Sequence, residues 1–427
     1  MYCGGCVRDN ALVAALRELG HEVLMVPLYL PLTLDEEDQS AGTPIFFGGI
    51  NVYLEQKAPI FGGAPGWLHE LLASRRLLQW AAGKAAKTRA AELGELTLSM
   101  LRGEAGNQAR EIEELLAWLK TQPKPDVLCL SNALLLGMAR RLKADLGAPV
   151  ACALQGEDSF LDGLPEIHRS ACWRTLAERA TDVDMFIAPS RYYGSLMRER
   201  LGLPAERVRV VHNGINLDGY GESKVQSPKS KVQGADSPVL GFFARMCPEK
   251  GLDTLVDAYI LLRQRGRVGN LKLHVGGSCG PADEPFVHSL RERLQANGLL
   301  SEAEFNPNTD RAAKLGFLRS LAVFSVPARY GEAFGLYLLE AMAAGVPVVQ
   351  PRVAAFPELI EATGGGVLCA ANDPHALGEA IEILLLDKTK SRALGETGRS
   401  AVFDRFSAEA MARAMARVYD EVAGKQT

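Results

Sequence analysis

Two carboxylates with a glycine between them are the first candidates for ligand chemistry. Glu332 and Glu340 flank the expected start of a helix in the segment SVPARYGEAFGLYLLEAMAAGVPVVQ, and Gly335 lies at that start. Free backbone N–H groups at a helix start can hold an anion. Both carboxylates can therefore face one ligand there. The spacing is equally consistent with a capped, solvated helix that leaves Glu340 exposed.

The flanking pattern predicts the elements that position these carboxylates. The apolar run 321–326 is typical of a buried strand, and a turn containing Pro327 follows it. A helical pattern covers 334–344, and the apolar residues 346–349 begin another strand. We therefore expect a β-loop-α-β unit whose loop carries the first glutamate.

Two cations occupy a comparable place earlier in the chain. Arg245 and Lys250 belong to the segment ARMCPEKG, which follows the predicted strand 239–243 and precedes a helix that begins near Leu252. A guanidinium fork and an ammonium group differ in geometry, but both suit a phosphate. The segment predicts an anion site beyond a strand end, with two ordinary surface cations as the alternative.

Glycines mark two further points of close approach. Gly276 ends a predicted strand and would let a nucleotide base come near the backbone. Near the start, Gly4 and Gly5 predict a turn before a helix over about 9–19, where a phosphate or sugar could bind, although a plain tight turn explains them as well. A strand over 22–30 should follow. The strand that should precede the turn is missing, so we expect a truncated start.

Polar residues follow two more predicted strands, 149–154 and 208–211. Strands that alternate with helices predict a parallel, doubly wound α/β sheet, and ligands bind beyond the carboxyl ends of such strands. The residues at these two ends are Gln155, Glu157, Asp158 and Asn213. Capping of a helix or turn is the alternative for the two acidic ones.

Composition excludes several classes of function. The chain has 427 residues and a formal net charge of −4, which argues against bulk nucleic-acid binding. No apolar run is long enough for a stable membrane span. A basic amphipathic pattern over 67–102 leaves peripheral membrane contact open, with a packed surface helix as the alternative. The scattered cysteines are typical of reduced thiols in a cytoplasmic protein, and we expect no metal site.

A stretch rich in Gly, Ser, Pro and Lys, GYGESKVQSPKSKVQGADSP, separates two runs of alternating strands and helices. We expect it to be a linker between two domains. The predicted segments are an N-terminal domain over 1–218 with a helical insertion at about 60–121, the linker 219–238, a C-terminal domain over 239–404, and a final helix over 405–427.

Four motifs now appear in a familiar order. They are Gly4-Gly5, Asn213-Gly214-Ile215, Arg245 with Pro248-Glu249-Lys250-Gly251, and Glu332-Ala333-Phe334-Gly335 followed by Glu340-Ala341. With them the chain resembles a two-domain GT-B glycosyltransferase. It is most like the retaining, nucleotide-sugar-dependent family 4, which includes sucrose-phosphate synthases and many bacterial mannosyl- and glucosyltransferases. The resemblance implies two Rossmann-like domains facing a cleft, with the C-terminal helix returning to the N-terminal domain.

The resemblance also implies roles for the site residues. A sugar would move with retention from a UDP-, GDP- or ADP-sugar to an unidentified sugar, glycan or lipid, without cofactor or metal. Arg245 and Lys250 would hold the diphosphate, Glu332 would lie by the donor sugar, and Glu340 would bind the ribose. The remaining donor contacts would come from Gly5, Gln155, Asn213, Gly276, Phe334, Gly335 and Leu336.

One position departs from the family pattern. Many relatives carry a histidine where this chain has Gln155. Glutamine can still hydrogen-bond a hydroxyl, and Glu157 or Asp158 are further candidates for contact with donor or acceptor. The alternative function is therefore a non-catalytic nucleotide-sugar-binding protein with a degenerate site. A nicotinamide oxidoreductase would need a G-x-G-x-x-G turn, which the sequence lacks.

Overall fold

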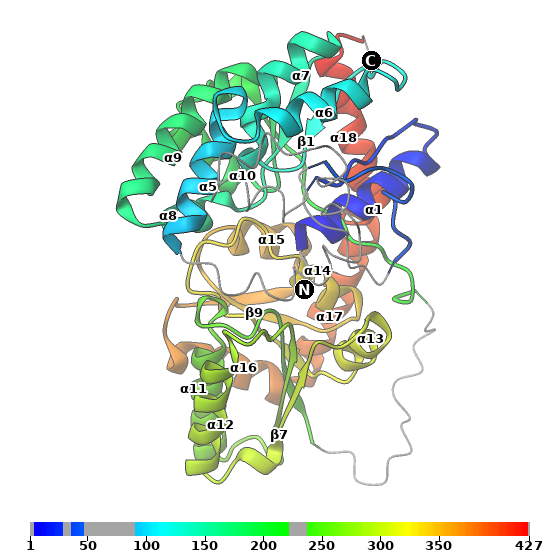
Figure 1. Cartoon of the computed structure of the whole chain (residues 1–427). Coiled ribbons are helices and arrows are strands. Elements are labelled where there is room, and N and C mark those ends of the chain that lie inside the picture. The colour runs from blue at the N-terminus through cyan, green and yellow to red at the C-terminus, as the bar shows by residue number, and fades with distance from the viewer. Residues whose placement is uncertain (1–3, 29–35, 47–89, 222–236, 426–427) are drawn as a thin grey trace. The chain divides into compact units, whose positions relative to one another are not determined.

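The computed structural model describes residues 4–28, 36–46, 90–221 and 237–425, which divide into two compact units (Figure 1). Of the described residues, the N-terminal unit contains those from Gly4 to His212 together with 412–425, and the C-terminal unit contains those from Asn213 to Met411. Much of the predicted linker and of the basic pattern over 67–102 lies outside the described residues. Within the described part of the chain, no helix combines the length and the apolar character that crossing a membrane requires.

The N-terminal unit is built on four parallel strands in the order β1-β2-β3-β4. Their bounds are β1 (Leu128–Leu130), β2 (Val150–Ala153), β3 (Met185–Ala188) and β4 (Val208–Val210). Leu128 aligns with Val150 in the first pair, and Ala151 aligns with Met185 in the second. Every residue of β2 and β3 is buried. This is why both strands are continuous apolar runs in the sequence.

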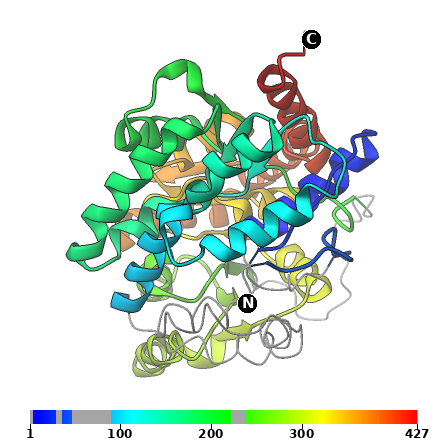
Figure 2. The same cartoon turned by 45° about the horizontal axis from the view of Figure 1, so that its top comes forward.

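Helices and short 3₁₀ turns connect these strands, and α5 lies beside α9 in both views (Figures 1 and 2). Ser190 begins one helix by accepting a hydrogen bond from the Tyr193 N–H, as the sequence predicts for a cap. The bounds are α1 (Gly4–Glu18), α5 (Ala90–Arg102), η3 (Gly103–Ala105), α6 (Ala109–Leu119), η4 (Ala133–Met138), α7 (Ala139–Leu146), α8 (Glu157–Asp162), α9 (Glu166–Arg179), η5 (Ala180–Asp182), α10 (Arg191–Leu201) and η6 (Ala205–Arg207).

Two expectations for the start of the chain are wrong. The predicted glycine turn is the first turn of α1, which begins at Gly4 rather than near Asp9. A Cβ added to Gly5 would lie 2.1 Å from the Gln155 side-chain oxygen, so this glycine permits close packing instead of a turn. The described part of the predicted strand 22–30, residues 22–28, forms no strand.

The C-terminal helix α18 (Ala408–Val422) returns to the N-terminal unit, as the fold class predicts. The Tyr419 hydroxyl is hydrogen-bonded to the Cys129 thiol of β1, close to Arg8 of α1. Farther along, the Arg209 guanidinium donates to the Glu421 carboxylate over 3.1 Å. These contacts join the end of the chain to both the first helix and the sheet of this unit.

The C-terminal unit holds six parallel strands in the order β10-β9-β8-β5-β6-β7. Their bounds are β5 (Val239–Phe243), β6 (Lys272–Gly277), β7 (Ala303–Pro307), β8 (Val323–Phe324), β9 (Val348–Pro351) and β10 (Gly366–Cys369). The chain runs outward from β5 through β6 to β7, then returns to β8 on the other side of β5. The order of the strands therefore reverses between β5 and β8. In open α/β sheets a ligand crevice forms at such a reversal, beyond the carboxyl ends of the strands.

Apolar side chains from the strands and the covering helices form one core in this unit. Fully buried members include Leu240, Phe242, Leu273, Val275 and Val348. The helices and 3₁₀ turns are η7 (Pro248–Lys250), α11 (Leu252–Arg265), α12 (Glu284–Ala296), η8 (Leu300–Glu302), α13 (Arg311–Arg319), α14 (Leu336–Ala343), α15 (Phe356–Thr363), α16 (Pro374–Leu386) and α17 (Lys388–Arg405).

Candidate functional site

The loops after β5 and β8 meet at the reversal of strand order. The Arg329 N–H of one loop donates to the Glu249 carbonyl of the other over 3.0 Å. Gly251 has φ +70°, and a Cβ there would lie 2.0 Å from the Pro327 carbonyl oxygen. Glycine is required at this position by both the left-handed backbone and the close approach. The two loops thus form one structure beyond adjacent strand ends.

Lys250 and Glu332 join these loops through an ion pair. The Lys250 Nζ lies 2.5 Å from Glu332 Oε2, and the Tyr337 hydroxyl donates to the same oxygen over 2.9 Å. The Lys250 Nζ also lies 5.7 Å from the centre of the Tyr337 ring. Burial raises the pKa of Tyr337 well above its usual range, so its hydroxyl remains a donor. We call these three residues the Lys250 cluster.

The Lys250 cluster is only partly covered by protein. The side chain of Lys250 is 28% exposed and that of Glu332 is 20% exposed. An ammonium group has three donor hydrogens and a carboxylate has two acceptor oxygens. Both groups therefore keep hydrogen-bonding capacity for a ligand while the ion pair holds them together.

The start of α14 lies directly after Glu332 in the chain. Gly335 has φ +100° and is the N-cap residue, and Leu336 is the first helical residue. The side chain of Phe334 is 4% exposed and packs into the hydrophobic core, which holds this turn in place. Helices leave their first N–H groups without partners inside the helix, and the dipole favours negative charge there. The predicted backbone donors thus lie at a helix start in the same loop as Glu332.

Arg245 has a partner that the sequence did not indicate. Its guanidinium donates to both oxygens of Asp283, with distances of 2.9 Å from Nη2 and 3.1 Å from Nε. This hydrogen bond raises the pKa of Arg245 above its ordinary value. The Asp283 side chain is 8% exposed, whereas that of Arg245 is 54% exposed. An acidic residue just before a helix is the one local signal that marks Asp283.

Glu340 also pairs with an unpredicted residue. The Lys314 Nζ of α13 lies 2.6 Å from Glu340 Oε1, and the two side chains are 20% and 19% exposed. The same Nζ lies 5.9 Å from the centre of the Phe243 ring at the end of β5. Gly276 adjoins that ring, because a Cβ there would lie 2.5 Å from it. The two glutamates thus contact different lysines.

In the N-terminal unit, Gln155 is held by its neighbours. Its Nε2 donates to the Ser131 carbonyl over 2.6 Å and to the Asp9 carboxylate over 3.2 Å. Its Oε1 faces the backbone of Gly5. The structure therefore places Gly5 and Gln155 in contact, two residues that the sequence analysis named separately as donor contacts.

Glu157 forms part of the loop that carries Gln155. Its Oε1 accepts from the Ala133 N–H over 2.7 Å, and its Oε2 accepts from the N–H of Gln155 and the Tyr193 hydroxyl, each over 2.9 Å. The Gly156 N–H adds a fourth bond over 3.0 Å. Glu157 is 5% exposed. These contacts support the structural alternative for Glu157.

The other two predicted residues lie in different surroundings. Asp158 Oδ1 is buried and has no hydrogen-bond partner within the described part of the chain. Burial raises the pKa of this carboxyl. Asn213 is 9% exposed and belongs to the C-terminal unit. Among the described residues, no group of three or more His, Cys, Asp or Glu side chains could hold a metal ion.

Two family models match consecutive parts of the chain. Residues 4–214 match the glycosyl transferase 4-like domain, and residues 224–401 match the glycosyl transferases group 1. Together these matches include the Lys250 cluster, Glu340 and Gln155.

Curated relatives of this chain include mannosyltransferases. The lipopolysaccharide core biosynthesis mannosyltransferase LpsB of Rhizobium meliloti is 34% identical over 224 residues, which are 50% of this chain and 62% of the relative. The phosphatidyl-myo-inositol mannosyltransferase of Mycobacterium leprae is 33% identical over 218 residues, 50% of this chain and 53% of the relative. The matches thus cover less than two thirds of either relative.

Solved structures show the same fold. HepE of Anabaena in complex with UDP has a TM-score of 0.64 at 19% identity, covering 75% of this chain and 84% of that one. Sucrose-phosphate synthase of Thermosynechococcus elongatus has a TM-score of 0.63 at 21% identity, covering 75% and 80%. Both family models and these neighbours agree, so the chain belongs to the GT4 family of GT-B glycosyltransferases, the group 1 glycosyl transferases with a glycosyl transferase 4-like N-terminal domain.

Proposed function

We propose that this chain is a retaining hexosyltransferase that takes its sugar from a nucleoside diphosphate sugar. The observation that carries the proposal is the Lys250 cluster at the reversal of strand order, beside the start of α14. A cation, backbone N–H donors and a carboxylate acceptor meet there. A donor of this class presents the complementary groups, which are a diphosphate anion and sugar hydroxyls.

The chemistry that these residues supply is stabilisation of the leaving group. Negative charge grows on the diphosphate as the bond to the sugar carbon breaks. Donors that are already aimed at this charge lower the barrier. Lys250 would contribute a point charge and Arg245 a guanidinium fork, and the start of α14 would contribute N–H groups and its dipole. This set can act without a metal ion.

Glu332 would act on the sugar and on Lys250 together. Its contact with the Lys250 Nζ fixes the cation beside α14, and its second oxygen can accept a hydrogen bond from a sugar hydroxyl. Transfer with retention would follow from attack of the acceptor on the face that the diphosphate leaves. We assign no protein nucleophile.

Glu340 would hold the ribose of the nucleotide. A carboxylate can accept two hydrogen bonds from neighbouring ribose hydroxyls. The Lys314 ammonium lies 2.6 Å from Oε1, and Oε2 can still accept hydrogen bonds because the Glu340 side chain is 19% exposed. The same lysine borders Phe243 and Gly276, so this corner is the proposed site of the nucleoside.

A non-catalytic nucleotide-sugar binder is the second candidate. The observation that favours it is that the Gln155 amide already donates to Ser131 and Asp9, which occupies the group that would otherwise contact a donor hydroxyl. The transferase proposal does not need Gln155 for leaving-group stabilisation. Only a turnover measurement separates the two.

The test uses the purified chain with radiolabelled UDP-, GDP- and ADP-hexoses. Both UDP and GDP donors belong in the panel, because the HepE structure contains UDP and a Mycobacterium tuberculosis relative is described as GDP-mannose-dependent. We expect one donor to lose its sugar to water or to an added acceptor, and Lys250→Ala to slow this release by about 10²–10³-fold. If a nucleoside diphosphate binds but no donor turns over with any acceptor, the transferase proposal fails and the binder remains.

A further inference from the structure

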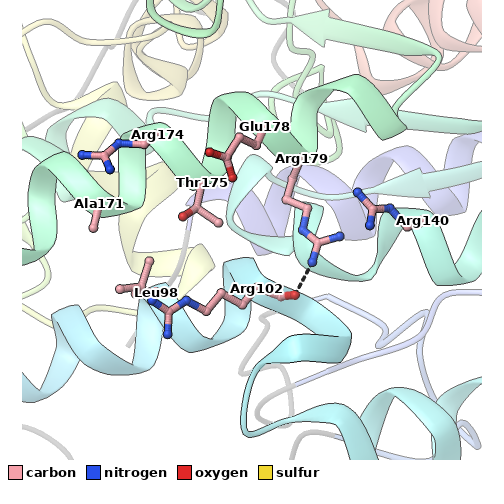
Figure 3. A pocket seen from close by; sticks show the side chains of 8 residues that line it. All are labelled: Leu98, Arg102, Arg140, Ala171, Arg174, Thr175, Glu178 and Arg179. Atoms are coloured by element: carbon pink, nitrogen blue, oxygen red, sulfur yellow. Dashed lines mark hydrogen bonds between the residues drawn. The ribbon is translucent and has the colours of Figure 1, made fainter.

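A pocket of about 450 Å³ lies in the N-terminal unit, between α5 and α9 with α7 at one end (Figure 3). Four of its eight lining residues are arginines. The lining is formed by Leu98, Arg102, Arg140, Ala171, Arg174, Thr175, Glu178 and Arg179. None of the predicted donor-site residues is among them.

Two of the arginines have structural partners. Arg179 is 8% exposed, donates to the backbone carbonyl of Arg102 at the end of α5, and lies 3.2 Å from Glu104 Oε1. Arg140 lies 3.3 Å from Asp182 and 3.5 Å from Glu104. The carboxylates of Glu104 and Asp182 are therefore already paired with these arginines, and neither carboxylate lines the pocket. Arg140 and Arg179 thus form an end of the pocket whose charge is balanced by these two carboxylates.

The other two arginines have no such partners. Arg102 and Arg174 are exposed, and within the described part of the chain neither guanidinium forms an ion pair or hydrogen bond. A cation in the last turn of a helix complements the helix dipole, which explains Arg102 at the end of α5. It does not explain Arg174, which is five positions before the end of α9. These two guanidinium groups come from opposite walls of the pocket (Figure 3).

The charged side chains that line the pocket, together with the carboxylates paired to them, have a net positive charge. The arginines contribute four positive charges, whereas the carboxylates beside them are those of Glu104, Asp182 and Glu178. Glu178 is on α9 and would repel an anion placed next to it. Arg102 and Leu98 lie on α5, away from that carboxylate (Figure 3). An anion would accordingly bind toward Arg102 and Arg174.

We propose that this pocket binds the phosphate of a phosphate ester. A phosphate has three terminal oxygens, so it can accept forked hydrogen bonds from guanidinium groups on two walls at once. The Thr175 hydroxyl supplies a neutral donor between them (Figure 3). The volume lies in the range of small-molecule sites, which leaves room for the esterified group. That group belongs either to a soluble metabolite or to a lipid head group.

The experiment measures phosphate-ester binding by the full chain with two probes. Calorimetric titration with glycerol phosphate tests the soluble source, and sedimentation with phosphatidic acid vesicles, against neutral phosphatidylcholine vesicles, tests the lipid source. The variant is Arg102→Gln with Arg174→Gln. Arg198→Gln is its matched control, because Arg198 is an exposed arginine on α10 with no ion pair within the described chain. Lys250→Ala separates this pocket from the proposed diphosphate site in the other unit.

We expect at least one probe to bind. Its affinity should weaken by about tenfold or more in the double variant, while Arg198→Gln and Lys250→Ala leave it within about twofold of the wild-type value. Binding of vesicles alone assigns the lipid source, and binding of glycerol phosphate assigns the soluble one. Absence of wild-type binding to both probes overturns the proposal, as does equal binding by the double variant. If the double variant does not fold, Arg174→Gln alone must weaken binding, because that exposed side chain supports no other contact.

Discussion

Carboxylates follow strands in both units, but their surroundings differ. Glu157 in the N-terminal unit accepts four hydrogen bonds and is 5% exposed. Glu332 in the C-terminal unit accepts from one lysine and one tyrosine and is 20% exposed. The first carboxylate has no capacity left for a ligand, whereas the second has. Position after a parallel strand therefore does not distinguish a carboxylate that can still accept hydrogen bonds from one that holds a loop, but the number of protein donors does.

The largest expected effect is on turnover, from Lys250→Ala, which removes the ion-pair partner of Glu332 in the C-terminal unit. If Lys250 contacts the leaving group as we propose, its removal should lower kcat/KM for donor turnover by about 10²–10³-fold. Steady-state turnover of the donor found in the panel measures this. Lys388→Ala, which removes an exposed lysine of α17, is the control and should leave kcat/KM unchanged. Wild-type turnover in Lys250→Ala would remove the basis of the proposed function.

Glu157→Ala should instead act on stability. It leaves the buried donors of Ala133 and Tyr193, and the partly buried N–H groups of Gln155 and Gly156, without their acceptor. We expect this loss to cost about 2–3 kcal/mol of unfolding free energy. Chemical denaturation measures the change. The exposed Glu199 on α10 provides the control Glu199→Ala, which should change stability by less than about 0.5 kcal/mol. A fully stable Glu157→Ala variant that has lost donor turnover would reverse the roles assigned to the two carboxylates.

Tyr337→Phe should have a smaller kinetic effect. It removes one of the two donors to Glu332 Oε2 and leaves the ion pair with Lys250. The net contribution of one hydrogen bond is about 0.5–1.5 kcal/mol. Its loss corresponds to a decrease of roughly two- to tenfold in kcat/KM. Tyr330→Phe is the matched control, since Tyr330 is 66% exposed. Equal rates in both variants would show that the hydroxyl does not position Glu332.

Asp158→Asn should produce the smallest effect, and its sign depends on pH. Burial raises the pKa of Asp158 above its ordinary 3.8. A raised carboxyl pKa contributes stability below the unfolded-state pKa, and this contribution is lost as pH rises through the folded-state pKa. The Asn variant should therefore have a higher Tm than the wild type at neutral pH, with the difference vanishing below about pH 4.

Thermal unfolding across this pH range measures the difference, with Glu199→Gln as a control that should show no pH-dependent gain. A lower Tm for Asp158→Asn at neutral pH would mean that the charged carboxylate is stabilised by a contact.

The sequence predicted the C-terminal sheet well except at its edges. Strand β5 has the predicted bounds, but β7 and β10 were not predicted, and these are the two edge strands. Edge strands are covered on fewer sides, so they need no continuous apolar run. The β7 sequence AEFNP includes a glutamate, an asparagine and a proline, and β10 begins with the last of three glycines. Neither segment was therefore predicted as a strand.

The site residues were predicted individually, but their partners were not. Motif order identified Arg245, Lys250 and Glu332 in loops beyond strand ends, and Glu340 inside the helix that follows. Their contacts with Asp283, Lys314 and Tyr337 depend on how separate elements pack. Asp283 is 38 positions from Arg245, and Lys314 is 26 positions from Glu340. Neither separation follows from a local pattern, so these contacts required the structure.

The most direct test of the central claim compares a nucleoside diphosphate with its nucleoside in calorimetric titrations. The nucleoside lacks the diphosphate, so a general loss of structure in Lys250→Ala would weaken both ligands alike. We predict that Lys250→Ala weakens the diphosphate by about tenfold or more while the nucleoside binds as it does to the wild type. An unchanged preference for the diphosphate in Lys250→Ala would contradict the assignment of the Lys250 cluster as the diphosphate site.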